Sequence, residues 1–295
     1  MSAAAAVTHR HKPEHFAYLL LLPALLIIVP FFLLPLAVLV RNSLSRDDPQ
    51  LILVDDVTLG NYVRILTDWY YSSLFINSLA TAAAVALITL VIGYPFAYYL
   101  VRWAGRRTSL LMWIVYTPII ISVITRVFGW MVITADTGLI NALLMRLGVI
   151  DGPLHILFGF AGMLIGMVHR YLPLMILPLV NAISRIDTRV MTASESLGAS
   201  GHDTFWRITL PLSLPGIVVG IQLTVAVVLS DYVLPTLLGT TRFRMIAPAI
   251  YDEAISMVRW ASAATMAIVT IAVVALVLIG MNLLMRRLAP WTRIL

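Results

Sequence analysis

Six stretches of the sequence are long enough and apolar enough to cross a lipid bilayer. The hydrocarbon core is about 30 Å thick, so a helix of about 20 mostly apolar residues spans it. A membrane offers no water to unpaired backbone groups, so these stretches must be helical. The sequence therefore predicts an all-α integral membrane protein with six transmembrane helices. The predicted spans are residues 17–40, 74–100, 109–133, 156–183, 212–234 and 261–285.

Prolines and short polar segments modify this pattern. Three prolines in the first span predict kinks, and Pro173 and Pro178 predict a broken fourth span; prolines are tolerated in membrane helices. Residues 59–66 predict a short amphipathic helix at the membrane interface. The first apolar run is expected to be a true span, because no small-residue cleavage site follows it. We expect one transmembrane domain, residues 17–288, between tails at 1–16 and 289–295.

The basic residues indicate how the chain is oriented. The net charge is +6, and most of the arginines lie at the ends of apolar runs. This pattern is typical of membrane topology and argues against nucleic-acid binding. By the positive-inside rule, both termini and the loop at about 185–211 are predicted to be cytoplasmic. The residues on that side are Arg10, Lys12, Arg102, Arg106, Arg107, Arg185, Arg189, Arg207, Arg286, Arg287 and Arg293.

The polar stretch 193–217 is the longest between two apolar runs in the second half of the chain. Its pattern predicts a helix, a break at residues 198–201, and a second short helix that stops at Pro211. Pattern alone leaves open an ordinary cytoplasmic loop with an amphipathic helix.

The same stretch resembles the "EAA" loop of membrane subunits of ABC importers, EAA-x3-G-x9-I-x-LP. Ala193, Gly198, Ile208, Leu210 and Pro211 fall on the motif without a gap. In that family the loop is a coupling helix that docks on the ATPase subunit. The leading Glu and second Ala of the motif are Thr192 and Ser194 here, and Glu195 follows three residues after Thr192. The expected coupling residues are Ala193, Glu195, Gly198, Ala199, Phe205, Ile208, Leu210 and Pro211.

The resemblance extends along most of the chain, to permeases of the spermidine/putrescine group. The string Gly93-Tyr94-Pro95-Phe96-Ala97-Tyr98 carries it most clearly. It implies a type I importer permease in a bacterial inner membrane. Its implied partners are a dimer of ATPase subunits, a second permease, an external solute-binding protein and membrane lipid. Relatives carry polyamines, opines and other small solutes, so the solute is expected to be a polyamine, a related cation or an opine; iron, thiamine, sulfate or an amino-acid derivative is the alternative.

Catalytic chemistry is not expected in this chain. Lys12 is its one lysine, and no GxxxxGK[ST] phosphate loop is present, so ATP and Mg²⁺ are expected in the partner ATPase and no cofactor here. No metal site is expected either, and no cysteine is present. The coupling loop argues against an ion channel or a secondary transporter, because neither docks on an ATPase. A membrane-embedded enzyme is disfavoured because the sequence offers no catalytic constellation for it.

Ionisable residues in or near the apolar spans are candidates for a solute path, because a charge at a helix centre costs about 2.5–3.5 kcal/mol. They are Arg126, the pair His169-Arg170, and Asp231. A carboxylate beside an aromatic ring suits an ammonium group, so Asp231 could meet a cationic solute. The alternative is an internal ion pair of Asp231 with Arg126 or Arg170. The predicted path residues are Arg126, Trp130, Arg170, Tyr171, Asp231 and Tyr232.

Overall fold

The computed structural model describes residues 14–47, 56–240 and 242–288. Throughout those ranges the regular structure is helical, with no strand. Six helices in them are long and apolar enough to cross a membrane, which confirms the all-α class and the predicted number of spans. The predicted tails fall almost entirely outside the described residues.

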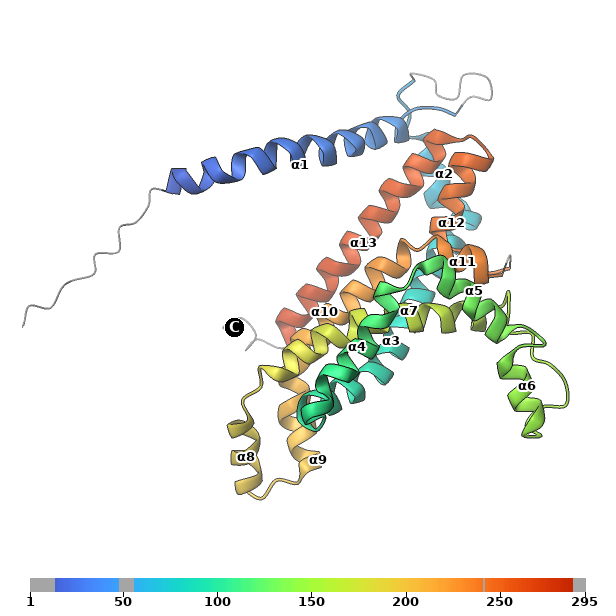
Figure 1. Cartoon of the computed structure of the whole chain (residues 1–295). Helices are drawn as coiled ribbons and strands as arrows, with labels where there is room; N and C mark the ends of the chain where they lie inside the picture. Colours follow the sequence, from blue (N-terminus) through green and yellow to red (C-terminus); the bar gives the residue numbers. More distant parts are fainter. Residues whose placement is uncertain (1–13, 48–55, 241, 289–295) are drawn as a thin grey trace, which may run out of the picture.

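Three helices form the centre of the bundle (Figure 1). They are α3 (Trp69–Arg102), α7 (Phe160–Ser184) and α10 (Leu210–Leu229), and they pack extensively on one another. Glycines let α10 approach α7 closely: a Cβ at Gly216 would lie 2.5 Å from the Ala182 Cβ. Such small-residue contacts are how membrane helices gain van der Waals packing where lipid offers no hydrophobic driving force.

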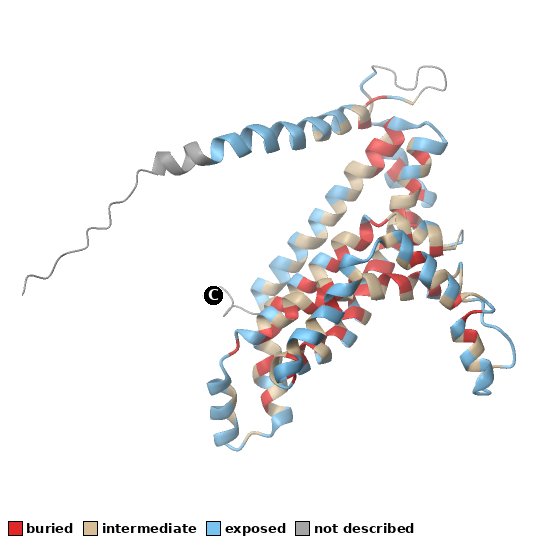
Figure 2. Ribbon diagram, viewed as in Figure 1, coloured by how far each residue is buried: buried red, intermediate tan, exposed pale blue. Residues whose placement is uncertain are grey.

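Two long helices lie outside this centre. Helix α13 (Trp260–Leu288) packs against α10, and α1 (Glu14–Ser43) packs against α13 near its own carboxyl end. The rest of α1 extends away from the bundle, and its side chains from Leu21 onward are mostly exposed (Figures 1 and 2). Its apolar surface therefore needs lipid or another protein to cover it.

The third predicted span, 109–133, is wrong as a single helix. The structure divides it into α4 (Thr108–Ile120) and α5 (Val123–Thr134), because Ile121 and Ser122 adopt extended backbone. A run of three β-branched isoleucines, residues 119–121, leads into the break, and such residues are stiff in helices. The Arg126 side chain compensates for the break by donating a 2.6 Å hydrogen bond to the Ile121 carbonyl. Helix α6 (Leu139–Arg146) follows.

Two proline expectations are also wrong. Helix α7 continues through Pro173 and Pro178 instead of breaking. The second short helix of the polar stretch does not stop at Pro211: α9 (Gly201–Thr204) passes through a π-helical turn (Phe205–Thr209) into α10. Pro211 lies near the start of α10, directly after the π turn. The widened π turn brings the Leu210 N–H to the Phe205 carbonyl.

The ends of the helices opposite α8 and α9 are joined by short helices. They are α2 (Gly60–Thr67), α11 (Val233–Leu238), α12 (Ile246–Tyr251) and a π-helical turn (Asp252–Ser256). Helix α2 confirms the short helix predicted at 59–66. It packs on α13, and Ile65 is buried in a small apolar cluster with Leu74 and Met266.

A distant aspartate caps the first turn of α13. The two carboxylate oxygens of Asp47 accept hydrogen bonds from the N–H groups of Ala261 (2.8 Å) and Ser262 (3.0 Å). The Ser262 hydroxyl donates a third, at 2.6 Å. Asp47 follows α1 closely in the chain, so this cap also ties the end of α1 to α13.

We expect Asp47→Ala to lower the free energy of unfolding by about 1–2 kcal/mol, the usual value of a helix cap. The thermal unfolding midpoint of the purified protein measures it. Asp56→Ala is the matched control, because Asp56 is an exposed carboxylate nine residues after Asp47 in the chain. Equal midpoints for the two variants would contradict the role of the cap.

Candidate functional site

The segment 185–211, called here the α8–α9 segment, projects from one end of the bundle (Figure 1). Helix α8 (Thr188–Ser196) begins after Asp187, whose carboxylate accepts from the Arg189 N–H at 2.9 Å. Ser200 caps α9 by accepting from the Asp203 N–H at 3.1 Å. No residue of α8 is buried, and Leu197 at its tip is 90% exposed. An exposed leucine at the tip of a projecting helix is suited to insertion into a partner protein.

Gly198 makes the turn between α8 and α9. Its φ of +85° lies in the left-handed region, which glycine adopts at no steric cost. A Cβ there would meet nothing within 4 Å, so backbone conformation alone requires the glycine. Across the turn, the hydroxyls of Ser194 and Thr204 form a 3.1 Å hydrogen bond.

Phe205 fixes the segment to the bundle. Its ring makes edge contacts with Tyr94 and Tyr98 of α3, at centroid distances of 5.8 and 5.5 Å. Leu210 packs against the same apolar cluster, which includes Ile183 and Ile217. Of the other predicted coupling residues, Ala193 and Glu195 are exposed, while Ala199, Ile208 and Pro211 are half-buried. The segment therefore has an exposed outer helix and is anchored to the bundle through Phe205 and Leu210.

A groove of about 530 Å³ separates α8 from the end of α3. Thr192 and Glu195 line one wall, one helical turn apart on the same face of α8. Arg102 and Trp103 line the other. Arg102 is the last residue of α3 and Trp103 follows it. Neither was predicted as a site residue, and Arg102 was interpreted only as an orientation signal. Thr192 stands where the motif has its glutamate, and Glu195 lies on the same face of α8 and lines the same groove.

Several of the arginines predicted to share one side gather at this end. Arg10, Lys12 and Arg293, which were predicted on the same side, lie outside the described residues. Arg102 lines the groove beside α8, and a second pocket, of about 470 Å³, places Arg185 near Met285 of α13. Arg286 and Arg287 follow directly in the last turn of α13. The structure thus brings basic groups from three separate helix ends to the α8–α9 end.

The predicted path residue Asp231 lies in the turn after α10, and its carboxylate is fully engaged. Its Oδ2 accepts a 2.5 Å hydrogen bond from the Tyr171 hydroxyl. Its Oδ1 accepts from the N–H groups of Val233 (2.9 Å) and Leu234 (3.4 Å) and lies 3.6 Å from Arg170 Nη1. The side chain is 2% exposed. Of the two interpretations offered by the sequence, this geometry favours the internal ion pair, with Arg170 as the partner.

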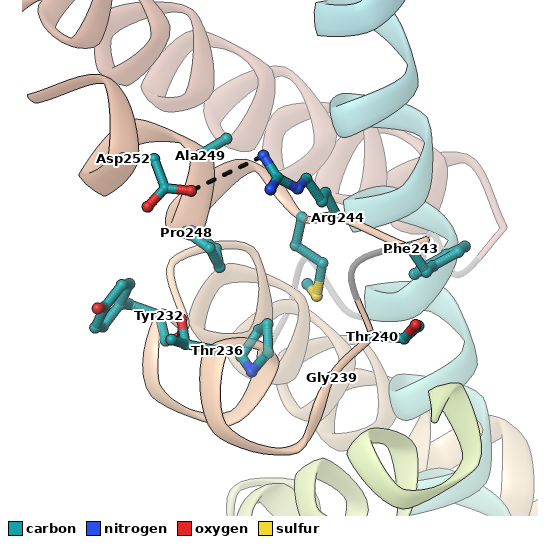
Figure 3. Close-up of a pocket in the computed structure, with 11 residues that line it drawn as sticks. Tyr232, Thr236, Gly239, Thr240, Phe243, Arg244, Pro248, Ala249 and Asp252 are labelled. Atoms are coloured by element: carbon teal, nitrogen blue, oxygen red, sulfur yellow. Dashed lines mark hydrogen bonds and ion pairs between the residues drawn. The ribbon is translucent and has the colours of Figure 1, made fainter. Parts of the chain in front are cut away.

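The other predicted path residues divide into two groups. Arg126 lies near Arg170, and Trp130 Nε1 donates a 3.2 Å hydrogen bond to His169 Nδ1. Tyr232 lies elsewhere: it stacks on Tyr251 at 4.6 Å and lines a pocket of about 150 Å³ at the α12 end (Figure 3). That pocket also holds the ion pair of Arg244 with Asp252, at 4.0 Å. In the described ranges no cluster of residues suited to a metal ion is present.

Comparison with known proteins places this geometry in a family. Residues 89–294 match the family described as "Binding-protein-dependent transport system inner membrane component". The spermidine/putrescine transport system permease protein PotB of Escherichia coli (strain K12) is 32% identical over 253 residues, which cover 85% of this chain and 91% of PotB. The molybdenum transport system permease protein ModB of Azotobacter vinelandii is 27% identical over 60% of this chain and 77% of its own.

A solved bacterial alginate ABC transporter, crystallised in complex with an alginate pentasaccharide-bound periplasmic protein, shares the fold. Its chain superposes with a TM-score of 0.77 at 18% identity, over 94% of this chain and 96% of that one. The predicted type I importer permease fold is thereby confirmed. The chain belongs to the family of inner membrane components of binding-protein-dependent transport systems and is the translocation subunit of an ABC importer for a small solute.

Proposed function

We propose that the α8–α9 segment is the coupling helix of this permease and docks on a dimer of ATPase subunits at the cytoplasmic face. The exposure of α8 around the Gly198 turn is the observation that supports this most. ATP and Mg²⁺ are bound by the ATPases, and this chain binds neither. Glu195 and Thr192 in the groove beside Arg102 provide the polar contacts of the docking surface.

The continuity of the helix supplies a mechanism. Because α9, the π turn and α10 form one unbroken path from Gly201 to Leu229, a displacement of the docked segment passes directly into α10. The other end of α10 lies beside Asp231, which holds Tyr171 and Arg170 of α7. Closure of the ATPases would thus move the coupling segment and the charged cluster together, and two permeases would rock between outward and inward openings.

The exposed surface of α1 supports a second permease and surrounding lipid as neighbours. Among the residues described, contacts hold the helix near its carboxyl end, where Thr265 Oγ1 donates to the Ser43 carbonyl at 3.0 Å. The second permease is proposed to be a homologous but different chain. The α12 end, with the pocket of Figure 3, then faces an external solute-binding protein.

The solute is proposed to be a small nitrogenous compound, a polyamine or related opine, because the PotB relatives are named for spermidine and putrescine. Another small solute is the alternative, since ModB is named for molybdenum and the alginate transporter for a polysaccharide. The chain is proposed to lie in a bacterial inner membrane with both termini in the cytoplasm.

Copurification separates this function from its rivals. A tagged chain, expressed with its partner subunits, should purify with an ATPase whose hydrolysis is stimulated by the solute-binding protein. A channel or a secondary transporter would purify without one.

Orientation is tested separately, by introducing single cysteines into this cysteine-free chain. We expect a membrane-impermeant maleimide to label Asp252→Cys in intact cells and His202→Cys only after lysis, because the basic helix ends lie on the side of His202. Both side chains are on accessible segments at opposite ends of the bundle. Labelling of position 202 in intact cells would contradict the orientation.

A further inference from the structure

The charged cluster of α5, α7 and the turn after α10 carries more positive than negative charge. Arg126 and Arg170 are close enough for their guanidinium groups to act on one another. In the described part of the chain, Asp231 is the one carboxylate within 4 Å of either arginine. Two cations against one anion leave one positive charge without compensation.

The hydrogen bonds of the cluster do not remove that charge. Arg126 donates to the neutral carbonyl of Ile121, and its Nε is buried without a partner. His169 is neutral, because its Nδ1 accepts the indole N–H of Trp130 and a protonated imidazole could not accept. The excess charge therefore belongs to the two arginines.

Asp231 is not free to meet a cation. Its two oxygens already accept three hydrogen bonds and face Arg170, and burial leaves the side chain 2% exposed. An ammonium group would have to displace Arg170 or enter the buried side of the cluster. Arg170, by contrast, keeps 24% of its side chain exposed. Arg170 Nη1 and Arg126 Nε are both buried without a hydrogen-bond partner. Each guanidinium therefore keeps an unused donor, whereas both oxygens of Asp231 already accept hydrogen bonds.

The depth of the cluster makes the excess charge costly. Arg170 lies ten residues into α7, about 15 Å along the helix axis at 1.5 Å per residue. An uncompensated charge in a membrane segment marks an ion or substrate pathway, because it costs several kcal/mol unless it faces a partner or a water-filled cavity. A planar guanidinium binds carboxylates and other oxyanions through two parallel hydrogen bonds.

We propose that Arg126 and Arg170 form an anion-binding station on the translocation path, which receives a carboxylate or another oxyanion group of the transported solute. The proposal rests on the proposed import function and narrows its solute. An opine or amino-acid derivative satisfies it through a carboxylate. A polyamine, which has no anionic group, does not. The competing explanation is a carboxylate of the partner permease that neutralises the arginines in the assembled importer.

Reaction rates of one introduced cysteine with charged reagents measure the local potential directly. Gly129→Cys is the probe: it lies one turn after Arg126 on the same face of α5, and a Cβ there has open space. The complete importer in membrane vesicles is treated with anionic sulfonatoethyl methanethiosulfonate or cationic trimethylammonioethyl methanethiosulfonate. Rates are divided by those of the same reagents with the neutral thiol 2-mercaptoethanol. Copurification of the ATPase from the same vesicles shows that the importer has assembled. A failure of the proposed import function can therefore be distinguished from a failure of the anion-binding proposal.

We expect the normalised rate ratio to favour the anionic reagent by about tenfold, because one uncompensated charge near the thiol acts with opposite sign on the two reagents. Arg126→Gln or Arg170→Gln should reduce the preference severalfold, while Arg126→Lys retains it. Arg146→Gln is the matched control, since Arg146 is an exposed arginine at the end of α6. A ratio equal to that of 2-mercaptoethanol means that a partner carboxylate neutralises the site, and overturns the proposal. A thiol that reacts with neither reagent also overturns it, because a solute path must admit ions.

Discussion

Gly198→Val is expected to weaken binding of the ATPase by about five- to thirtyfold while the transmembrane bundle stays folded. A β-branched residue is an outlier at positive φ, and forcing an L-residue into the left-handed region costs about 1–2 kcal/mol. At 1.4 kcal/mol per factor of ten, that strain alone is enough if the docked state needs this turn. No buried residue of α8 would resist a change in its direction, so the strain should be relieved by reorienting α8.

The experiment compares two variants at one position. Gly198→Asn is the matched control, because asparagine tolerates the left-handed conformation and Gly198 has open space around it. The amount of ATPase that copurifies per mole of permease measures binding. The thermal unfolding midpoint in detergent shows whether the transmembrane bundle is folded. The account predicts loss of ATPase for valine, near-normal ATPase for asparagine and similar midpoints for both. Equal amounts of copurified ATPase for the two variants would contradict the conformational role of Gly198.

Asp231→Ala is expected to destabilise the protein by about 3–5 kcal/mol, the usual cost of removing one member of a buried ion pair. The change leaves Arg170 without its carboxylate and the Tyr171 hydroxyl without its acceptor. It also frees the N–H groups of Val233 and Leu234 at the start of α11. The loss should therefore combine an unpaired charge with three unmade hydrogen bonds.

Two further variants identify the cause. Asp252→Ala removes a carboxylate that is 43% exposed and 4.0 Å from Arg244, so it should cost at most about 1 kcal/mol. Arg170→Leu in the Asp231→Ala background should recover part of the stability by removing the unpaired cation. The effects of both variants are measured by the midpoint of thermal unfolding and the yield of assembled importer. If Asp231 instead met a cationic solute, Asp231→Asn would abolish uptake with assembly and midpoint unchanged.

The sequence predicted the features that depend on local pattern. Apolar runs of sufficient length identified the spans, and the spacing from Gly198 to Pro211 identified the α8–α9 segment before its shape was known. The sequence predicted a break at residues 198–201, and the structure places a turn at Gly198. The structure assigns this to its positive φ and shows no close contact.

What the sequence could not show depends on distant contacts. Nothing in the loop around Asp47 indicates that its carboxylate caps a helix more than 200 residues away. Hydropathy does not distinguish a continuous span from the broken pair α4 and α5, because the break at Ile121 is apolar and Arg126 satisfies its carbonyl. The partner of Asp231 was left open between two arginines, and only packing of α7 against α10 brings Arg170 to it.

Cross-linking from the tip of α8 tests the docking of the coupling segment most directly. A photoreactive phenylalanine analogue is placed at Leu197, which is 90% exposed, and for comparison at Tyr251, which is 44% exposed at the opposite end. Each of the two variants is expressed with its ATPase, partner permease and binding protein, and is irradiated in membranes. The account predicts a cross-link to the ATPase from position 197 and none from position 251. An ATPase cross-link from position 251, or none from position 197 in an importer that hydrolyses ATP, would contradict it.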